Sequence, residues 1–411
     1  MSTKRLKNKP SWQRGFVLRL LSPMNLGYMK IVLPEGTAVE YGSKAHPFHG
    51  YAHIKNENFF KKCFFHGDIG FGESYVDGDW ETDDLTKVLE WMILNVENHP
   101  TLMASKSKKY SVSFLKFFDN IRHRFRSNTV KGSKKNISAH YDLGNDFYSL
   151  FLDPTMTYSS GYFAAPQTTL EESQTAKYEK LCQKLKLQAS DHVLEIGCGW
   201  GGFSEHAARK YGCRITAVTI SREQFNYAKE RLRKAGLESL VEVQLVDYRH
   251  IKGQYDKIIS IEMIEAVGHE HLEKYFDCCH RLLKQNGILA LQMILAPDHR
   301  YESFRKRTDW IQKHIFPGGL LPSFEAVHHA IKKTGELCLH DFEDMAPHYA
   351  RTLKIWRAHL NQKKNKLHEM GFDPTFLRKW NYYFSYCEAA FTMRNISVAQ
   401  AVFSRPNNHN L

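Results

Sequence analysis

The stretch Val193-Leu194-Glu195-Ile196-Gly197-Cys198-Gly199-Trp200-Gly201-Gly202 decides the fold. Its apolar first half predicts a short buried strand, its glycines predict a turn, and the residues through Tyr211 predict a helix. Parallel α/β sheets use this order to bring backbone up to a nucleotide. Glycine has no Cβ atom where a ligand must lie against the main chain. The helix that follows directs its amide donors to the same place.

The flanking residues favour a methyl donor over a dinucleotide. A dinucleotide site has an acid about 20 residues beyond the first glycine, where it binds the ribose hydroxyls. Here the second predicted strand ends at Thr219, with Gln224 one helical turn further on. The turn also lacks the lysine of a phosphate-binding P-loop. A nucleoside with a charged tail free of phosphate fits better, and we expect S-adenosylmethionine.

The rest of the C-terminal part alternates between strand and helix patterns. This alternation is typical of a parallel sheet covered by helices. The last strand lies far along the chain, as in methyltransferases whose final strand inserts antiparallel. We expect segments 297–323 and 349–388 to be insertions that cap the site. Strands are expected at 192–196, 213–219, 241–246, 256–261, 287–294, 335–341 and 398–404.

The N-terminal part predicts a small α+β unit. Strands are expected at 30–33 and 51–54, and helices at 58–63 and 84–94. Between the helices, residues 67–80 are rich in glycine and acids, as a calcium loop is. The alternating ligand spacing of such a loop is absent, so we predict no metal there or elsewhere.

Composition indicates a globular chain with two domains. It has 411 residues, of which 42% are hydrophobic and 25% charged. No apolar run approaches the ~20 residues that span a bilayer. The basic start of the chain lacks the apolar segment of a secretory signal. The eight cysteines form no Cys-x-x-Cys pair, which favours a reduced cytoplasm without structural zinc.

The net charge of +13 suggests either nucleic acid or an anionic membrane as a partner. We find no zinc-finger, RNA-recognition or helix-turn-helix pattern, so we expect no nucleic acid and prefer the membrane. Residues 1–20 and 105–136 mix basic with apolar side chains, and both could lie on a membrane surface. A solvated tail and a flexible linker are the alternatives. The predicted localisation is cytoplasmic and peripheral on the inner membrane face.

Several segments of the sequence resemble those of one protein family. These are VLEIGCGWGGF, AVTISREQ, GDIGFGESYVDGDWE, HYDLGNDFY and IFPGGLLPS. They are similar to the cyclopropane-fatty-acyl-phospholipid synthases, and the resemblance covers nearly the whole chain. It implies a class I methyltransferase domain with a seven-stranded sheet and capping helices, preceded by a small α+β domain like a lipid carrier. The expected boundaries are 1–104 for this domain, 105–136 for a basic linker and 137–411 for the methyltransferase domain.

The resemblance also implies the site residues. Glu265, Tyr349 and Ile294 fall where the family holds a bicarbonate ion that acts as the base. Ser160 and Gln292 stand where many bacterial members have Cys and His; both can still donate hydrogen bonds, and the resemblance implies that the contact of the Cys is largely through its backbone. The residues expected to bind S-adenosylmethionine are Tyr158, Ser159, Gly197, Gly199, Gly201, Thr219, Gln224, Asp247 and Tyr248.

The implied activity is transfer of a methylene unit to the double bond of an unsaturated phospholipid acyl chain. The double bond attacks the methyl group, and bicarbonate then takes a proton from the resulting cation so that a cyclopropane ring closes. A methyl- or methylene-branched product is the alternative on the same substrate. Two other classes are a methyltransferase acting on nitrogen or oxygen and a lipid-binding protein without activity. A homodimer is considered, and the oligomeric state is left open.

Overall fold

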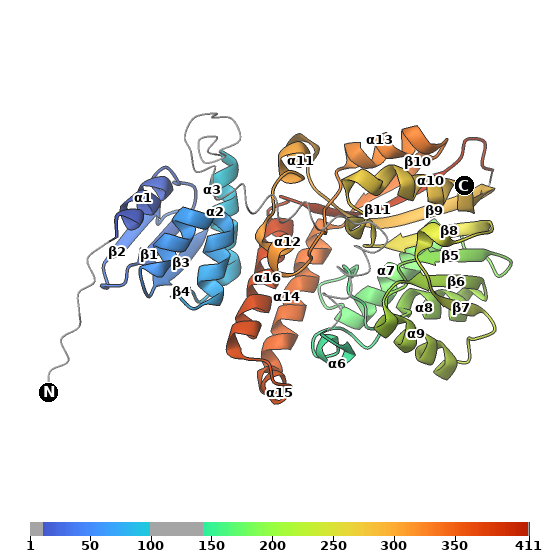
Figure 1. Ribbon diagram of the computed structural model, residues 1–411, viewed down its shortest axis with the longest axis horizontal. Helices are drawn as coiled ribbons and strands as arrows, with labels where there is room; N and C mark the ends of the chain where they lie inside the picture. Colours follow the sequence, from blue (N-terminus) through green and yellow to red (C-terminus); the bar gives the residue numbers. More distant parts are fainter. Residues whose placement is uncertain (1–10, 99–142, 410) are drawn as a thin grey trace.

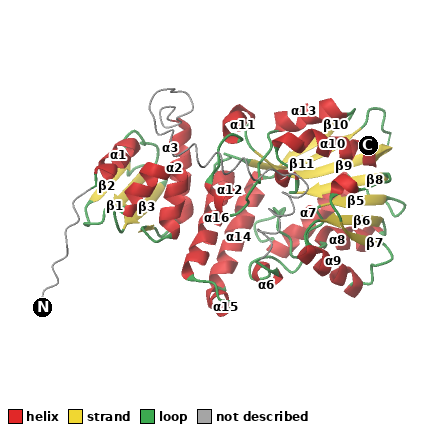
Figure 2. Cartoon of the chain, viewed as in Figure 1, coloured by secondary structure: helices red, strands yellow, loops and turns green. Residues whose placement is uncertain are grey.

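The computed structural model describes residues 11–98, 143–409 and 411 (Figure 1). These residues form two sheets, one of four strands near the N-terminus and one of seven strands in the C-terminal part. Helices lie between and around the two sheets (Figure 2). The predicted linker at 105–136 and both domain boundaries, near 104 and 136, fall outside the described residues, so they stay predictions.

The N-terminal sheet has the order β2-β1-β3-β4. Its strand β1 pairs antiparallel with β2 and parallel with β3. The two strands predicted at 30–33 and 51–54 are confirmed, whereas β2 and β4 were not predicted. The bounds are β1 Tyr28–Val32, β2 Ala38–Gly42, β3 His49–Ile54 and β4 Trp80–Glu81, with helices α1 Trp12–Leu21, α2 Asn58–Val76 and α3 Leu85–Asn98.

Helix α2 is much longer than the segment 58–63 predicted for it. It continues through the glycine-rich stretch, with a kink at Gly67. The glycines serve close packing there: a Cβ at Gly70 would lie 2.0 Å from the Lys62 carbonyl oxygen, and one at Gly72 would lie 2.5 Å from the Trp310 ring. The glycine pattern therefore reflects helix packing.

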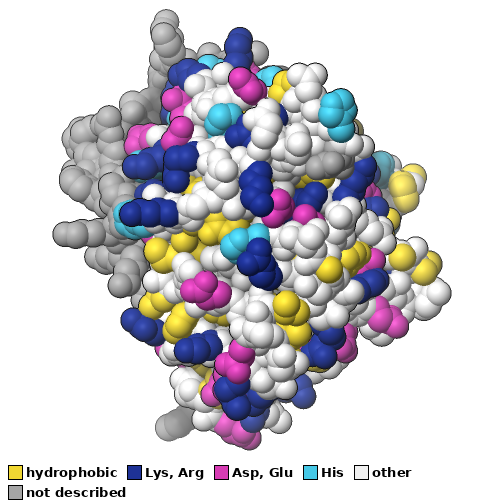
Figure 3. All heavy atoms as spheres, turned by 90° about the vertical axis from the view of Figure 1, so that its right-hand side faces the viewer, with side chains coloured by type: hydrophobic (Ala, Val, Ile, Leu, Met, Phe, Trp, Pro, Cys, Tyr) yellow, Lys and Arg dark blue, Asp and Glu magenta, His cyan; other side chains and the backbone are white. Residues whose placement is uncertain are grey.

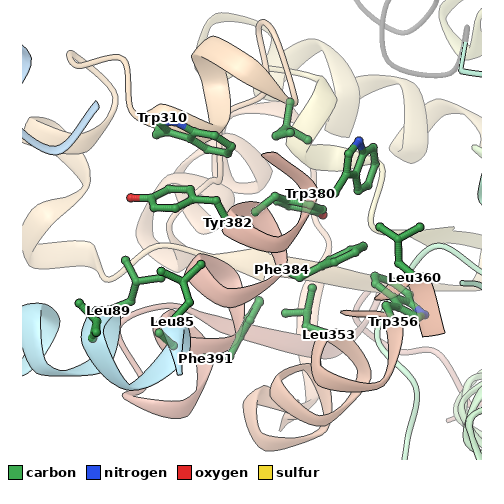
Figure 4. Packing of buried hydrophobic residues seen from close by; sticks show 14 of the residues in the cluster. Leu85, Leu89, Trp310, Leu353, Trp356, Leu360, Trp380, Tyr382, Phe384 and Phe391 are labelled. Carbon is green, nitrogen blue, oxygen red and sulfur yellow. The ribbon is translucent and has the colours of Figure 1, made fainter. Parts of the chain in front are cut away.

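The α2 and α3 helices of the N-terminal unit pack on the long helix α16 (Pro374–Thr392). Leu85 and Leu89 of α3 face the buried aromatic cluster around α16 (Figure 4). Polar contacts cross the same boundary, because Arg378 donates from Nε to the Tyr75 carbonyl at 2.8 Å and Thr86 donates to Glu388 at 3.1 Å. Apolar burial is the main stabilising term in such an interface.

The seven-stranded sheet has the order β10-β11-β9-β8-β5-β6-β7. Strand β11 runs antiparallel between β9 and β10, and the remaining neighbours pair in parallel. This arrangement confirms the predicted class I methyltransferase sheet and its inserted last strand. The strands are β5 His192–Ile196, β6 Arg214–Thr219, β7 Val241–Leu245, β8 Tyr255–Ile261, β9 Leu283–Leu295, β10 Cys338–Asp344 and β11 Ser397–Ser404.

Helices cover this sheet, with α8 beside α9 and α10 beside α13 (Figure 1). The surface at this end of the molecule carries basic and acidic side chains intermixed (Figure 3). The helices are α6 Asn145–Tyr148, α7 Leu170–Lys184, α8 Gly202–Tyr211, α9 Arg222–Lys234, α10 Leu272–Leu282, α11 Asp298–Phe304, α12 Trp310–His314, α13 Phe324–Thr334, α14 Ala346–Gln362, α15 Lys364–Glu369 and α16. Short 3₁₀ turns are η1 Tyr248–His250, η2 Ile264–Ala266 and η3 His269–His271.

Candidate active site

The glycine turn after β5 forms the floor of a cavity. Gly197, Gly199 and Gly201 all have positive φ, at 82°, 53° and 83°, a backbone conformation that costs little only for glycine. The Val218 carbonyl accepts hydrogen bonds from Gly197 N at 2.9 Å and Cys198 N at 3.0 Å. The turn is thereby held at the carboxyl ends of two neighbouring strands, where ligands bind in open α/β sheets.

A cavity of about 370 Å³ extends from this turn. Thr219 and Gln224 lie together on its wall, joined by a hydrogen bond of 2.9 Å. Gly201 does not line it, because this residue is the N-cap of α8 and a Cβ there would meet Ala228 of α9 at 3.1 Å. The other residues predicted to bind S-adenosylmethionine do line it, namely Tyr158, Ser159, Gly197, Gly199, Thr219, Gln224, Asp247 and Tyr248. Their contact with the donor stays a prediction.

Asp247 is already engaged by a neighbouring cation. The Arg249 guanidinium donates to its carboxylate from Nε at 2.8 Å and from Nη2 at 2.6 Å. Burial works to raise the pKa of Asp247, but the hydrogen bonds from Arg249 outweigh it and the pKa is lowered. Asp247 therefore presents an ionised, oriented carboxylate beside the cavity.

The two insertions close the cavity with aromatic rings. The predicted segments 297–323 and 349–388 both contribute lining residues, among them Phe316 and Tyr383. The Tyr158 hydroxyl donates to the Tyr383 hydroxyl at 3.1 Å, and Tyr349 stacks on Phe391 with ring centroids 4.5 Å apart. Ring faces of this kind attract a positive charge.

Glu262 brings most of the predicted catalytic groups together. Its carboxylate accepts hydrogen bonds from Ser160 N at 2.9 Å and from Gln292 Nε2 at 2.7 Å. The Tyr349 hydroxyl donates to the same carboxylate. Burial raises the pKa of Glu262, and these donors together with the charge of Lys177 work against that rise. The family resemblance gave no role to Glu262.

Glu265 lies one short turn further along the chain and has fewer partners. Its Oε1 accepts from Ile294 N at 2.5 Å, whereas Oε2 is buried without a hydrogen-bond partner among the described residues. Burial, followed by the negative charge of Glu262, raises the pKa of Glu265 to about 8. Two adjacent carboxyls in one dry site titrate apart in this way.

Comparison with known proteins identifies the family. The family model described as mycolic acid cyclopropane synthetase matches residues 101–401. The chain belongs to this family. It is 40% identical over 346 residues to the tuberculostearic acid methyltransferase UfaA1 of Mycobacterium tuberculosis, covering 82% of this chain and 78% of that protein. It is 35% identical over 364 residues to the cyclopropane-fatty-acyl-phospholipid synthase of Escherichia coli, covering 86% and 87%.

Solved structures of cyclopropane synthases share the fold of the C-terminal part. The mycolic acid cyclopropane synthase CmaA1, complexed with SAH and CTAB, has a TM-score of 0.62 at 31% identity, and the match covers 66% of this chain and 98% of that one. The cyclopropane synthase MmaA2 of Mycobacterium tuberculosis has the same TM-score at 30% identity over the same shares. This chain is therefore an S-adenosylmethionine-dependent methyltransferase of the cyclopropane synthase family.

The hydrogen-bond donors that the family resemblance assigns to bicarbonate already have partners. Ser160 N, Gln292 and Tyr349 bond to Glu262, and Ile294 N bonds to Glu265. Since two carboxylates of the chain, those of Glu262 and Glu265, occupy these donors, the residues present do not fit a bound bicarbonate ion. We therefore derive no step through bicarbonate.

Sequence reasoning missed three residues of this site. Lys177 of α7 is fully buried and donates from Nζ to Ser159 Oγ at 2.7 Å; burial lowers its pKa to about 7 against the opposing pull of Glu262. Gln400 of β11 donates from Nε2 to Gln292 Oε1 at 3.1 Å. The third residue is Glu262, which lines the cavity, whereas Lys177 and Gln400 act through their contacts with Ser159 and Gln292.

None of the helices among the described residues has the length and apolar character needed to cross a membrane.

Proposed function

We propose that the chain transfers a methylene unit from S-adenosylmethionine to the double bond of an unsaturated phospholipid acyl chain and forms a cyclopropane ring. The observation that carries this proposal is one cavity that combines a glycine turn, a wall of aromatic rings and two buried carboxyls. The name of the Escherichia coli relative, a cyclopropane-fatty-acyl-phospholipid synthase, supports the same substrate class.

The residues of the cavity suit this chemistry. When bound, S-adenosylmethionine supplies an electrophilic methyl group on a positively charged sulfur. A double bond is a weak nucleophile, so the walls must align it and exclude water. The rings of Tyr349 and Tyr383 line the cavity, where they stabilise a carbocation through their negative faces. A base must then remove a proton for the ring to close.

A branched product on the same substrate is the second candidate. The relative with 40% identity is named a tuberculostearic acid methyltransferase, and this supports transfer of a methyl group. Both outcomes pass through the same cation and differ in which carbon loses a proton. The geometry of the buried carboxyls relative to the acyl chain would decide between them.

Membrane attachment is a further part of the proposal. Helix α1 exposes Trp12, Phe16 and Leu20, at 66%, 47% and 45% of their surfaces, and α2 adds Phe65 at 41%. Ring contacts through Phe64 join them, with centroids 4.7 Å from Trp12 and 5.1 Å from Phe65. We name these five residues the aromatic patch. An exposed patch of this kind marks an interaction surface.

The charge around the aromatic patch fits an anionic bilayer. Arg19 and Lys61 are exposed on the same two helices. The ten residues that precede α1 in the sequence contain Lys4, Arg5, Lys7 and Lys9 and no acid. Basic residues attract anionic lipid head groups while aromatic residues enter the interface. Such a contact would bring the enzyme to phospholipid acyl chains.

Product analysis tests the proposed function. The purified full chain is incubated with S-adenosylmethionine labelled on its methyl carbon and with vesicles of mono-unsaturated phosphatidylethanolamine and phosphatidylglycerol. We expect the acyl chains to gain one labelled CH2 by mass spectrometry, and vesicles with saturated chains to gain none. Label on the head-group amine with unchanged acyl chains would contradict the proposal and favour a nitrogen methyltransferase.

A further inference from the structure

We propose that the carboxylate of Glu262 is the base that takes the proton in this reaction, in place of a bound bicarbonate ion. The inference rests on the proposed function and adds a catalytic residue to it. It starts from the convergence of Ser160 N, Gln292 Nε2 and the Tyr349 hydroxyl on one carboxylate. Three donors aimed at one point form an anion site, and the anion in it belongs to the chain.

The backbone at Glu262 supports a functional reason for this side chain. Its φ is 49°, in the left-handed region, directly after the end of β8. Glycine adopts this conformation freely, whereas a residue with a side chain is strained in it. Strain of this kind persists where the surroundings impose it, and it clusters at active sites. A glutamate at a position that suits glycine indicates that its carboxylate is needed.

Neighbouring strands hold Glu262 in place. Its own backbone N donates to the Gln292 carbonyl at 2.7 Å. The Gln292 amide is itself oriented by Gln400 on the next strand, at 3.1 Å. The amide nitrogen of Gln292 consequently points at Glu262, and the base is fixed from two sides. Glu262 lines the same cavity as the glycine turn and the aromatic rings, which places it beside the space where donor and acyl chain would meet.

The surroundings of Glu262 oppose the rise in pKa that burial causes more strongly than the surroundings of Glu265 do. Glu262 has three donors and the nearby charge of Lys177, whereas Glu265 has one donor and an unpartnered oxygen. With its pKa raised to about 8, Glu265 carries its proton at neutral pH. Pairs of carboxyls whose environments separate their pKa values are typical of acid and base assignments.

The proposed step balances as follows. The π electrons of the double bond form a bond to the methyl carbon while the carbon–sulfur bond breaks, and that electron pair stays on sulfur as a neutral thioether. This leaves a cation on the second alkene carbon. The electrons of a C–H bond of the new methyl group then form a carbon–carbon bond to that cation, and the ring closes. The proton of that bond goes to the Glu262 carboxylate, which becomes a neutral acid and later returns the proton to solvent.

Two variants and one depletion test this assignment. The parent, Glu262→Gln and Glu262→Gly are assayed on mono-unsaturated vesicles in CO2-free buffer, with and without added bicarbonate. Donor affinity by calorimetry and the melting temperature report folding separately from turnover. Glu262→Gly removes the carboxylate, relieves the backbone strain and leaves the three donors free for an added anion.

We expect the parent to turn over at the same rate with and without bicarbonate. Glu262→Gln should lose at least about 100-fold in kcat while it binds the donor within about threefold of the parent. Glu262→Gly should be inactive in CO2-free buffer and regain at least about tenfold with bicarbonate or formate.

Loss of parent activity on bicarbonate depletion, or a Glu262→Gln variant within about threefold of the parent, would overturn the assignment. Either result leaves the proposed function standing, because in both cases the parent still modifies the lipid when bicarbonate is present. A parent that modifies no unsaturated lipid would instead refute the proposed function, and this assignment with it.

Discussion

Gln400 of β11 lies directly opposite Gln292 of β9, and its Nε2 donates to Gln292 Oε1 at 3.1 Å. Both side chains are buried. This contact determines which way the Gln292 amide faces, and so which group it offers to Glu262. An antiparallel strand inserted late in the chain thereby sets the geometry of a site built mainly from parallel strands.

Removing this contact should slow the reaction more than it weakens binding. In Gln400→Ala the Gln292 amide loses its oriented partner, so we expect kcat to fall at least about tenfold. The KM for S-adenosylmethionine should stay within about twofold of the parent. Steady-state kinetics check this, with Gln183→Ala, at an exposed amide on α7, as the control. A kcat equal to that of the control would show that Gln400 does not position Gln292.

Glu265→Gln should change how stability depends on pH. The folded-state pKa of about 8 lies above the ordinary glutamate value of 4.5, so the stability linked to this group is present below pH 4.5 and is lost as the pH rises to about 8. The glutamine variant lacks this loss. Its free energy of unfolding relative to the parent should therefore rise by about 1.4 kcal/mol per pH unit between about pH 5 and 8.

Urea unfolding at several pH values measures this difference. Glu238→Gln, at an exposed position, is the control. A Glu265→Gln difference that stays constant across the range would contradict the protonated state assigned to Glu265.

Gly72→Ala should weaken the packing between the N-terminal unit and the methyltransferase domain. A Cβ at this position would lie 2.5 Å from the Trp310 ring and 2.7 Å from the Tyr382 ring. Both rings are buried and cannot move aside cheaply, so we expect a loss of about 1–3 kcal/mol in unfolding free energy. Gly15→Ala, where a Cβ meets nothing within 4 Å, is the control and should be neutral or slightly stabilising.

The aromatic patch should govern vesicle binding. We expect Trp12→Ser with Phe16→Ser to weaken binding to anionic vesicles at least about tenfold, because two large apolar side chains no longer enter the interface. Cosedimentation with vesicles measures the effect. Phe342→Ser, at a residue on β10 that is 43% exposed, is the matched control. Equal binding by the double variant and the control would place the membrane contact elsewhere.

Much of the fold could be predicted from the sequence because its patterns are local. The run from Val193 to Ile196 and the glycines after it specify a strand and a turn by their own chemistry. The short strand β2 could not be predicted, because most of its residues are exposed. The extent of α2 was also missed, because Gly70 admits the Lys62 carbonyl of the same helix across its kink and Gly72 admits the Trp310 ring from a distant segment.

The site was predicted only in part, for a related reason. Ser160, Gln292 and Tyr349 were predicted to surround a bicarbonate ion, and in the structure they converge on a carboxylate of the chain. That this anion is Glu262 follows from the left-handed backbone at the end of β8, which periodicity does not reveal. In the sequence, Lys177 looks like an ordinary exposed lysine of a helix, and only the structure shows that it is buried and donates to Ser159.

Carbon NMR of the acyl chains after reaction with methyl-labelled S-adenosylmethionine tests the central claim most directly. The account predicts that the label appears as the CH2 of a cyclopropane ring, coupled to the two former alkene carbons. A label found as an exocyclic methylene or a branched methyl would contradict ring closure and support the second candidate, and a label absent from the acyl chains would contradict the account as a whole.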